Sequence, residues 1–130
     1  MALVDVLIVD NSVAIRKILQ RVLTQTSLPL GKVVEAGDGR EALERMKREN
    51  IGLIIADVNM PNMDGLQLLS ELKASDQWKH VPVLMISTEG SQTKVMEAVR
   101  LGALGFIRKP FTADQIKEKL ADVLLLPWSG

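Results

Sequence analysis

Short apolar runs alternate along the chain with segments in which apolar residues recur every three or four positions. Runs of this length indicate strands, and the periodic segments between them indicate helices. The run at 51–57 is apolar at successive positions, which is typical of a strand buried on both faces. The pattern predicts an α/β fold, a (βα)5 chain with a doubly wound parallel five-stranded sheet. The expected strands are 3–10, 32–36, 51–57, 81–87 and 104–109.

Helix boundaries are indicated by residues that favour a helix start, a helix end or a turn. Ser12 opens the first helix, Asp64 is placed to cap the third, and Gly102 is placed to end the fourth. Pro29 and Gly31 predict a turn before the second strand. The side chains expected to point inward are Ile15, Leu19, Val22, Leu23, Ala42, Leu43, Met46, Leu66, Leu69, Leu72, Val95, Met96, Val99, Ile116, Leu120 and Val123.

Composition narrows the class of protein. A chain of 130 residues, 47% hydrophobic, suits one domain over 1–130 with a sizeable core. It carries 16 basic and 16 acidic residues, which argues against nucleic acid or an anionic membrane as the partner. It has no cysteine, so disulfides and thiolate chemistry are excluded. Without a signal-like N-terminus or an apolar run near the roughly 20 residues of a membrane span, we expect a cytoplasmic protein.

Polar residues end most of the predicted strands. In a parallel sheet these ends share one edge, where open α/β folds place their functional sites. Two carboxylates and an amide oxygen suit a hard divalent cation such as Mg²⁺. A carboxylate beside a metal, a hydroxyl and an ammonium can also accept a phosphoryl group. The simpler alternative is that acids at strand ends only cap the following helices. The residues are Asp10 and Asn11 after the first strand, Asp57 after the third, Ser87 and Thr88 after the fourth, and Lys109 after the fifth.

These residues lie in segments that resemble the receiver domain of two-component response regulators, especially the stand-alone chemotaxis receivers of the CheY type. Beside Asp10, the resemblance rests on DVNMPNMDG (57–65), MISTEG (85–90) and GFIRKPF (105–111), and it covers essentially the whole chain. It implies a flavodoxin-like fold with strand order 2-1-3-4-5. It also implies a signalling protein that catalyses only its own phosphorylation and dephosphorylation, and is otherwise not an enzyme.

The resemblance assigns roles to individual residues. Asp57 would take a phosphoryl group from the phosphohistidine of a histidine kinase. Asp10, Asp57 and the backbone carbonyl of Asn59 would hold Mg²⁺. Ser87 would draw toward a phosphoryl oxygen, and Lys109 would pair with Asp57 or with its phosphoryl group. The bond from Lys109 to Pro110 is commonly cis in this family, which an X-Pro bond allows at low cost.

Further roles that the resemblance implies concern the conformational switch and the lifetime of the phosphoryl group. Phe106 matches an aromatic residue that turns inward on activation, although plain packing is the alternative. Asn59 and Glu89 flank the site and would tune dephosphorylation, so we expect a short-lived phosphoryl state. A downstream protein would bind the face formed by the fourth helix, the fifth strand and the fifth helix, which includes Lys94, Phe106 and Lys117. We expect a monomer.

Asn11 departs from the family pattern, which normally places a second acid there. A neutral amide removes one charge from the cation site, so Mg²⁺ affinity should fall and carboxylate repulsion in the metal-free state should ease. Asn11 could instead cap the first helix, or do both.

Several functions fit these observations to different degrees. The first is a phosphoacceptor with weakened Mg²⁺ binding, which the presence of Asp57, Ser87 and Lys109 favours. The second is a degenerate receiver that acts as a phosphorylation-independent protein-interaction adaptor. An aspartate phosphohydrolase is disfavoured because no Asp-x-Asp follows the first strand. A flavin or dinucleotide binder is disfavoured because no Gly-rich loop follows that strand.

Three features outside the site have simple structural interpretations. We interpret His80 as a solvated loop residue, Trp78 as a loop anchor, and 124–130 as a frayed helix end.

Overall fold

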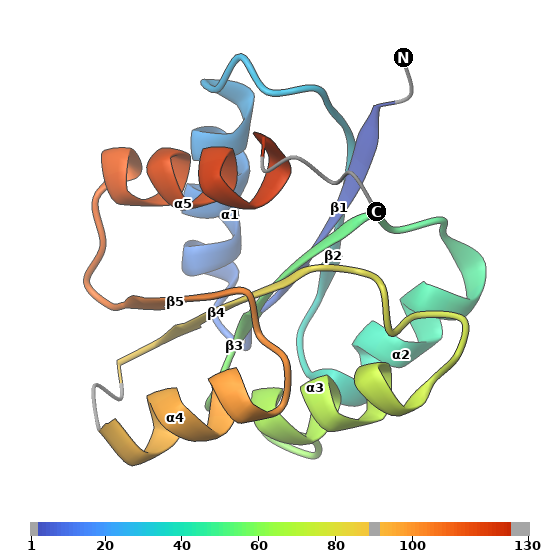
Figure 1. Ribbon diagram of the computed structural model, residues 1–130. Helices are drawn as coiled ribbons and strands as arrows, with labels where there is room; N and C mark the ends of the chain where they lie inside the picture. The colour runs from blue at the N-terminus through green and yellow to red at the C-terminus, as the bar shows by residue number, and fades with distance from the viewer. Residues whose placement is uncertain (1–2, 89–91, 126–130) are drawn as a thin grey trace.

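The computed structural model describes residues 3–88 and 92–125. Within them, five parallel strands form one sheet in the order β2-β1-β3-β4-β5 (Figure 1). This is the predicted flavodoxin-like order, and it places β5, with Arg108, at an edge. The strands are β1 (Val4–Val9), β2 (Leu30–Ala36), β3 (Leu53–Asp57), β4 (Val83–Ser87) and β5 (Gly105–Arg108).

Helices cover both faces of the sheet, so each face has its own apolar core. One core joins α1 and α5 to the sheet, and the other joins α2, α3 and α4 to its opposite face (Figure 1). β3 is buried at every position, as its unbroken apolar run predicts. The helices are α1 (Val13–Thr24), α2 (Gly39–Arg48), α3 (Gly65–Ala74), α4 (Gln92–Arg100) and α5 (Ala113–Leu125).

Side-chain caps start the helices that leave the carboxyl edge of the sheet. The Ser12 hydroxyl accepts the Ile15 N–H at 3.2 Å and caps α1. Asp64 caps α3 in a capping box with Gln67, which confirms the prediction for Asp64. The alternative that Asn11 caps the first helix is wrong, because Ser12 occupies the N-cap position and Asn11 is exposed beside it.

The turn predicted at Gly31 is also wrong, because β2 begins at Leu30 and includes this glycine. The register between β1 and β2 shifts between Val4 and Val6, and a Cβ on Gly31 would collide with the Asp5 carboxylate. That carboxylate accepts the Lys32 N–H at 2.8 Å. The glycine therefore permits a close approach at an irregular point of the strand pair rather than a turn.

Two apolar side chains of α4 do not point inward as predicted. Met96 and Val99 are 62% and 60% exposed, whereas Ala98 is fully buried and Val95 partly so. Helical periodicity identifies an apolar stripe, but only the neighbouring elements decide how much of the stripe is covered. In the described part of the chain, α4 contacts α3 and β5 along a narrow strip.

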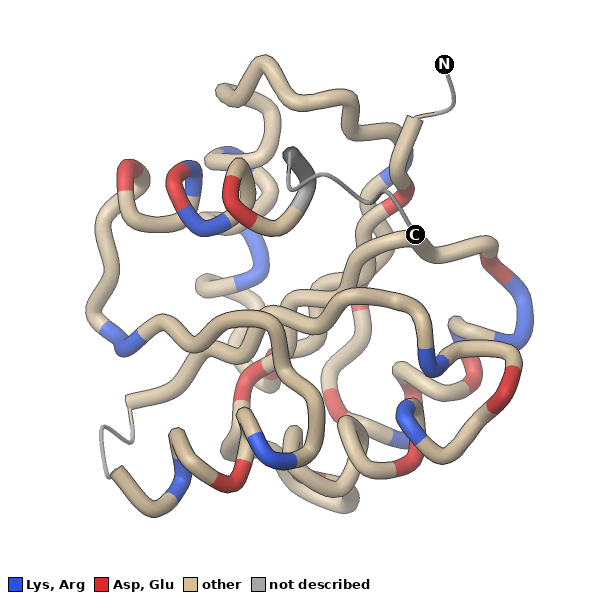
Figure 2. The backbone as a smooth tube through the Cα atoms, in the orientation of Figure 1, with Lys and Arg blue, Asp and Glu red and all other residues tan. Residues whose placement is uncertain are grey.

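The rest of the described surface shows ordinary exposure and a mixed distribution of charge. His80 is exposed, and Trp78 packs partly against the core on the α3 side. Basic and acidic residues are interspersed along the helices rather than gathered on one face (Figure 2). No helix in the described residues is long and apolar enough to span a membrane. The tail expected to fray falls largely on 126–130, outside the described residues.

Candidate functional site

The three buried polar side chains of the described residues lie together at the carboxyl edge of the sheet. Asp10, Asp57 and Ser87 follow or end β1, β3 and β4, and they are 2%, 8% and 0% exposed. All three were predicted from the sequence as strand-end residues. Burying two acids side by side destabilises a fold unless they are paired, so their convergence indicates a site rather than chance placement.

Lys109 enters this site from the end of β5. Its ammonium lies 2.9 Å from an oxygen of Asp10 and 3.5 Å from an oxygen of Asp57. Its backbone N–H donates to the Ser87 carbonyl at 2.7 Å, which places the lysine beside the end of β4. The peptide bond between Lys109 and Pro110 is cis. The lysine therefore bridges both acids and makes its closer contact with Asp10.

Asp10 is held at both its backbone and its carboxylate. Its N–H donates to the Ala36 carbonyl at 3.0 Å, and one carboxylate oxygen accepts the Ser12 N–H at 2.8 Å. The Arg16 guanidinium donates to the Asp10 carbonyl at 2.6 Å and to the Glu35 carboxylate at 2.9 Å. The loop between β1 and α1 is thus tied back to β2 on two sides.

Arg16 and Glu35 were not predicted as part of the site. The usable signal is Glu35 itself, an acid between apolar residues near the end of the second strand, which suggests a cationic partner. The identity of that partner depends on how α1 packs beside β2, which local sequence does not reveal.

Burial raises the pKa of Asp57 above its ordinary value, and the nearby charge of Asp10 adds to the rise. The Lys109 ammonium and the backbone N–H of Asn59 act in the opposite direction without cancelling it. The ionised Asp57 is therefore poorly solvated, and a cation that neutralised it would find a favourable position.

Ser87 and Phe106 lie near the acid pair, but their side chains contact different parts of the structure. The Asn59 side-chain amide donates to the Ser87 hydroxyl at 3.3 Å, linking β4 to the loop after β3. Phe106 on β5 is partly buried and packs against the core on the α4 side. Thr88 is exposed, and Glu89 lies outside the described residues.

Comparison with known proteins agrees with this geometry. Residues 6–121 match the model of the response regulator receiver domain. The chain belongs to the receiver domain family. Two relatives, the chemotaxis protein CheY-3 of Vibrio cholerae and the CheY homolog of Campylobacter jejuni, are each 40% identical to this receiver. The matches cover 88% and 91% of this chain and 87% and 90% of theirs.

Solved structures are similar over nearly the whole receiver. Chemotaxis protein CheY4 of Vibrio cholerae has a TM-score of 0.85 at 36% identity, covering 95% of this chain and all of that one. CheY in the CheX–CheY–BeF3–Mg²⁺ complex of Borrelia burgdorferi has a TM-score of 0.84 at 34% identity, covering 92% of this chain and 88% of that one. The receiver is thus of the CheY type, with a signalling rather than a metabolic role.

Receivers of this type generally use Mg²⁺, and the residues of this site fit a hard cation. Asp10 and Asp57 offer carboxylate oxygens, and the exposed Asn11 beside them offers a neutral one. Among the described residues, no three or more His, Cys, Asp or Glu side chains form a group that could hold a metal. Lys109 already lies between the two carboxylates, so a cation would share them with an ammonium.

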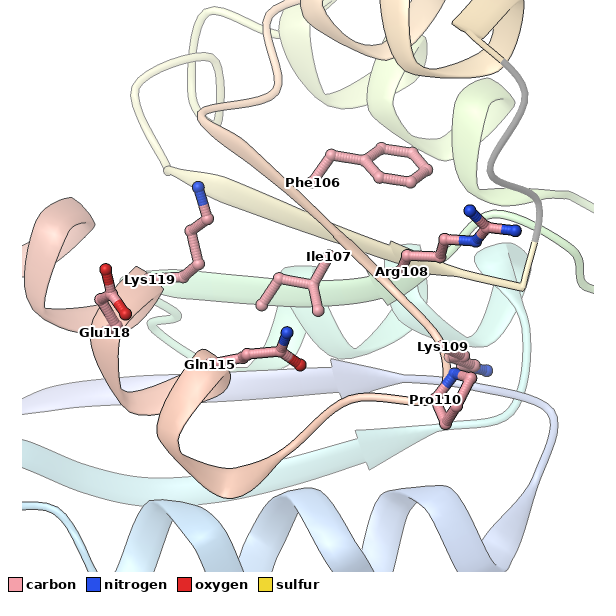
Figure 3. Close-up of a pocket in the computed structure, with 8 residues that line it drawn as sticks. All are labelled: Phe106, Ile107, Arg108, Lys109, Pro110, Gln115, Glu118 and Lys119. Atoms are coloured by element: carbon pink, nitrogen blue, oxygen red, sulfur yellow. The ribbon is translucent and has the colours of Figure 1, made fainter.

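A groove of about 480 Å³ lies between the edge strand β5 and α5 (Figure 3). Its charged side chains are three cations and one anion, so the groove carries a positive balance. It opens beside both Phe106 and Lys109 and therefore adjoins the acidic site. The lining residues are Phe106, Ile107, Arg108, Lys109, Pro110, Gln115, Glu118 and Lys119.

Proposed function

We propose that this receiver is a working phosphoacceptor, in which Asp57 takes a phosphoryl group from the phosphohistidine of a histidine kinase. The observation that carries the proposal is the burial of Asp57 beside Asp10 and Ser87, with Lys109 reaching both acids. A structural ion pair would need one acid, whereas this site holds two acids, a buried hydroxyl and one lysine.

The chemistry requires a nucleophile and a means of neutralising phosphoryl oxygens. A carboxylate oxygen of Asp57 attacks the phosphorus, an O–P bond forms, and the electron pair of the breaking N–P bond stays on the kinase imidazole. Lys109 is close enough to Asp57 to pair with the transferred group, and the Ser87 hydroxyl would donate to one of its oxygens. Mg²⁺, held by Asp10, Asp57 and the Asn59 carbonyl, would supply the remaining positive charge.

Switching would begin at Ser87. Its hydroxyl now accepts a hydrogen bond from Asn59, and drawing it toward a phosphoryl oxygen would break that contact. Space would then open next to Phe106, which is only partly buried on β5. A change there would alter the face of α4, β5 and α5, including Lys94 and Lys117. Two packings of this face with different partner affinities would suffice to transmit the signal.

The charges of the β5–α5 groove indicate what a downstream protein should present. Arg108 and Lys119 favour a partner with acidic side chains. We propose that the receiver acts as a monomer. Asn59 follows Asp57 by two residues and Glu89 follows Ser87 by two residues. We propose that Asn59 and Glu89 tune the lifetime of the phosphoryl group.

The test is direct phosphorylation with a small acyl phosphate and millimolar Mg²⁺, followed by mass spectrometry of the intact chain. We expect a mass gain of one phosphoryl group that is absent from D57N and labile at alkaline pH, as an acyl phosphate is. Absence of any gain in the wild-type chain would overturn the proposal.

The alternative is a phosphorylation-independent adaptor, and the ion pair between Lys109 and Asp10 favours it because the pair competes with a cation. Binding of a downstream partner to D57N with wild-type affinity, together with no phosphorylation of the wild-type chain, would support this alternative.

A further inference from the structure

The loop between β3 and α3, residues 58–64, is tethered to the start of α2. The Asn62 side-chain amide donates to a carboxylate oxygen of Asp38 at 2.8 Å. The Gly39 N–H donates to the Met63 carbonyl at 3.1 Å, and a Cβ on Gly39 would lie within 3 Å of Met63. Residues far apart in the sequence thus hold the loop by two adjacent contacts.

Asp38 uses its two carboxylate oxygens for different purposes. One accepts the Glu41 N–H at 2.9 Å and caps α2, and the other accepts the amide of Asn62. The Glu41 backbone N–H and then the Asn62 amide hold the pKa of Asp38 below its ordinary value. The carboxylate therefore stays ionised and keeps both contacts at neutral pH.

Asn62 has a φ of 65°, the left-handed region that residues other than glycine seldom adopt. Asparagine tolerates this region better than most residues, but glycine would adopt it without cost. Asparagine brings the amide that reaches Asp38, which glycine lacks. The contact, rather than the backbone conformation, explains the asparagine at this position.

The same loop carries Asn59, whose side-chain amide donates to the Ser87 hydroxyl at 3.3 Å and whose backbone N–H acts to lower the pKa of Asp57. Before Asn59 the loop is fixed at Val58, which donates to the Ile86 carbonyl at 3.0 Å and accepts from the Gly65 N–H at 2.8 Å. After Asn59 the side-chain anchor is Asn62. The conformation available to Asn59 therefore depends on both anchors.

We propose that Asp38 and Asn62 form a positioning pair for the cation site. Neither contacts the acids, but together they hold the loop that carries Asn59, whose backbone carbonyl is assigned to the cation under the proposed function. This inference rests on the proposed function, because it assigns a role in Mg²⁺ binding. A site with a neutral Asn11 attracts the cation less strongly, so its affinity depends more on preorganised geometry.

Three variants separate positioning from folding. D38N keeps the cap through its side-chain oxygen, because Asn caps helices as well as Asp, and it turns its NH₂ group toward Asn62 in place of the oxygen that accepts the Asn62 amide. N62G removes the amide and also the backbone cost of the left-handed conformation. The double variant D38N/N62D places the amide at position 38 and the carboxylate at position 62. It restores a contact between an amide and a carboxylate, and it keeps the wild-type net charge.

The measurements are the Mg²⁺ dissociation constant by calorimetry, the Tm, and the phosphorylation rate at saturating Mg²⁺. We expect each single variant to raise the Kd about fivefold, below the roughly 10- to 100-fold typical of contacts behind metal ligands, because solvent competes for this exposed pair. Rates at saturating Mg²⁺ should stay near wild type. N62G should keep or exceed the wild-type Tm, and D38N/N62D should return the Kd to within about twofold of wild type.

Wild-type Kd values in D38N and N62G would overturn the inference and leave the proposed function intact. A Kd that D38N/N62D does not restore would also overturn it, since the loss would then come from the cap or from charge. A wild-type chain that neither binds Mg²⁺ nor accepts a phosphoryl group would overturn the proposed function, and this inference with it.

Discussion

Replacing Asn11 with Asp tests how strongly the charge of the cation site limits metal binding. Asn11 is exposed and directly follows the buried Asp10, which is paired with Lys109. The change adds one carboxylate at the mouth of a site that holds two. If electrostatic attraction limits affinity, N11D should bind Mg²⁺ more tightly than the wild-type chain.

The expected gain follows from Coulomb's law. A unit charge and a divalent ion about 4 Å apart attract by about 2 kcal/mol in water and by about 8 kcal/mol at an effective dielectric constant near 20. Because position 11 is exposed, the lower figure applies, and it corresponds to roughly 30-fold in affinity. Screening near physiological salt reduces this to roughly tenfold. The metal-free protein should lose about 1 kcal/mol of stability, because the new carboxylate repels its neighbours.

The assay is a calorimetric Mg²⁺ titration at low and at physiological ionic strength, with thermal melts of the metal-free protein. N50D is the matched control, because Asn50 is also exposed and the change adds the same charge outside the strand-end site. We expect tighter binding in N11D alone, with a smaller gain at higher salt. Equal Kd values for N11D and wild type would refute the reasoning, and an equal gain in N50D would attribute it to net charge.

Further predictions concern the residues around the acid pair. Burial raises the pKa of Asp57 above 3.8, so its ionised form destabilises the fold, and D57N should raise the Tm at pH 7. Melts across pH should show this gain shrinking as pH falls through the folded pKa and vanishing below 3.8; a constant gain would contradict it. K109M leaves Asp10 buried without its cation and should lower the free energy of unfolding in urea by about 3 kcal/mol. An unchanged free energy of unfolding would contradict a stabilising pair between Lys109 and Asp10. G65A places a Cβ against the Asp57 carbonyl oxygen and should cost at least about 2 kcal/mol in the same assay. G37A, whose nearest neighbouring atom is 3.9 Å from the new Cβ, should be tolerated, and equal losses would argue against a steric cause.

Much of the fold and part of the site were predictable because they depend on local patterns. The continuous apolar run of β3 indicated a central parallel strand, and the structure confirms that every residue in it is buried. The Asp64 cap was predictable because its partners lie within one helical turn. The convergence of Asp10, Asp57 and Ser87 followed from topology alone, since parallel strands end at the same edge of a sheet.

Other features depend on which elements become neighbours. The apolar stripe of α4 did not reveal that Met96 is exposed, because coverage depends on what α3 and β5 leave uncovered. The pairing of Lys109 more closely with Asp10 than with Asp57 likewise depends on side-chain distances.

The amino-acid sequence by itself determined the alternation of strands and helices, the helix starts at Ser12 and Asp64 and the chemical types at the carboxyl edge, because each depends on short-range patterns or on strand direction. The strand order was predicted from the resemblance to receiver domains. Only the tertiary structure decided how those groups are held. Arg16 reaches Glu35 across α1 and β2, and Asn62 reaches Asp38 across two loops. The physical reason is that a hydrogen bond requires atoms to meet within about 3 Å, and residues distant in sequence meet only after the helices pack on the sheet.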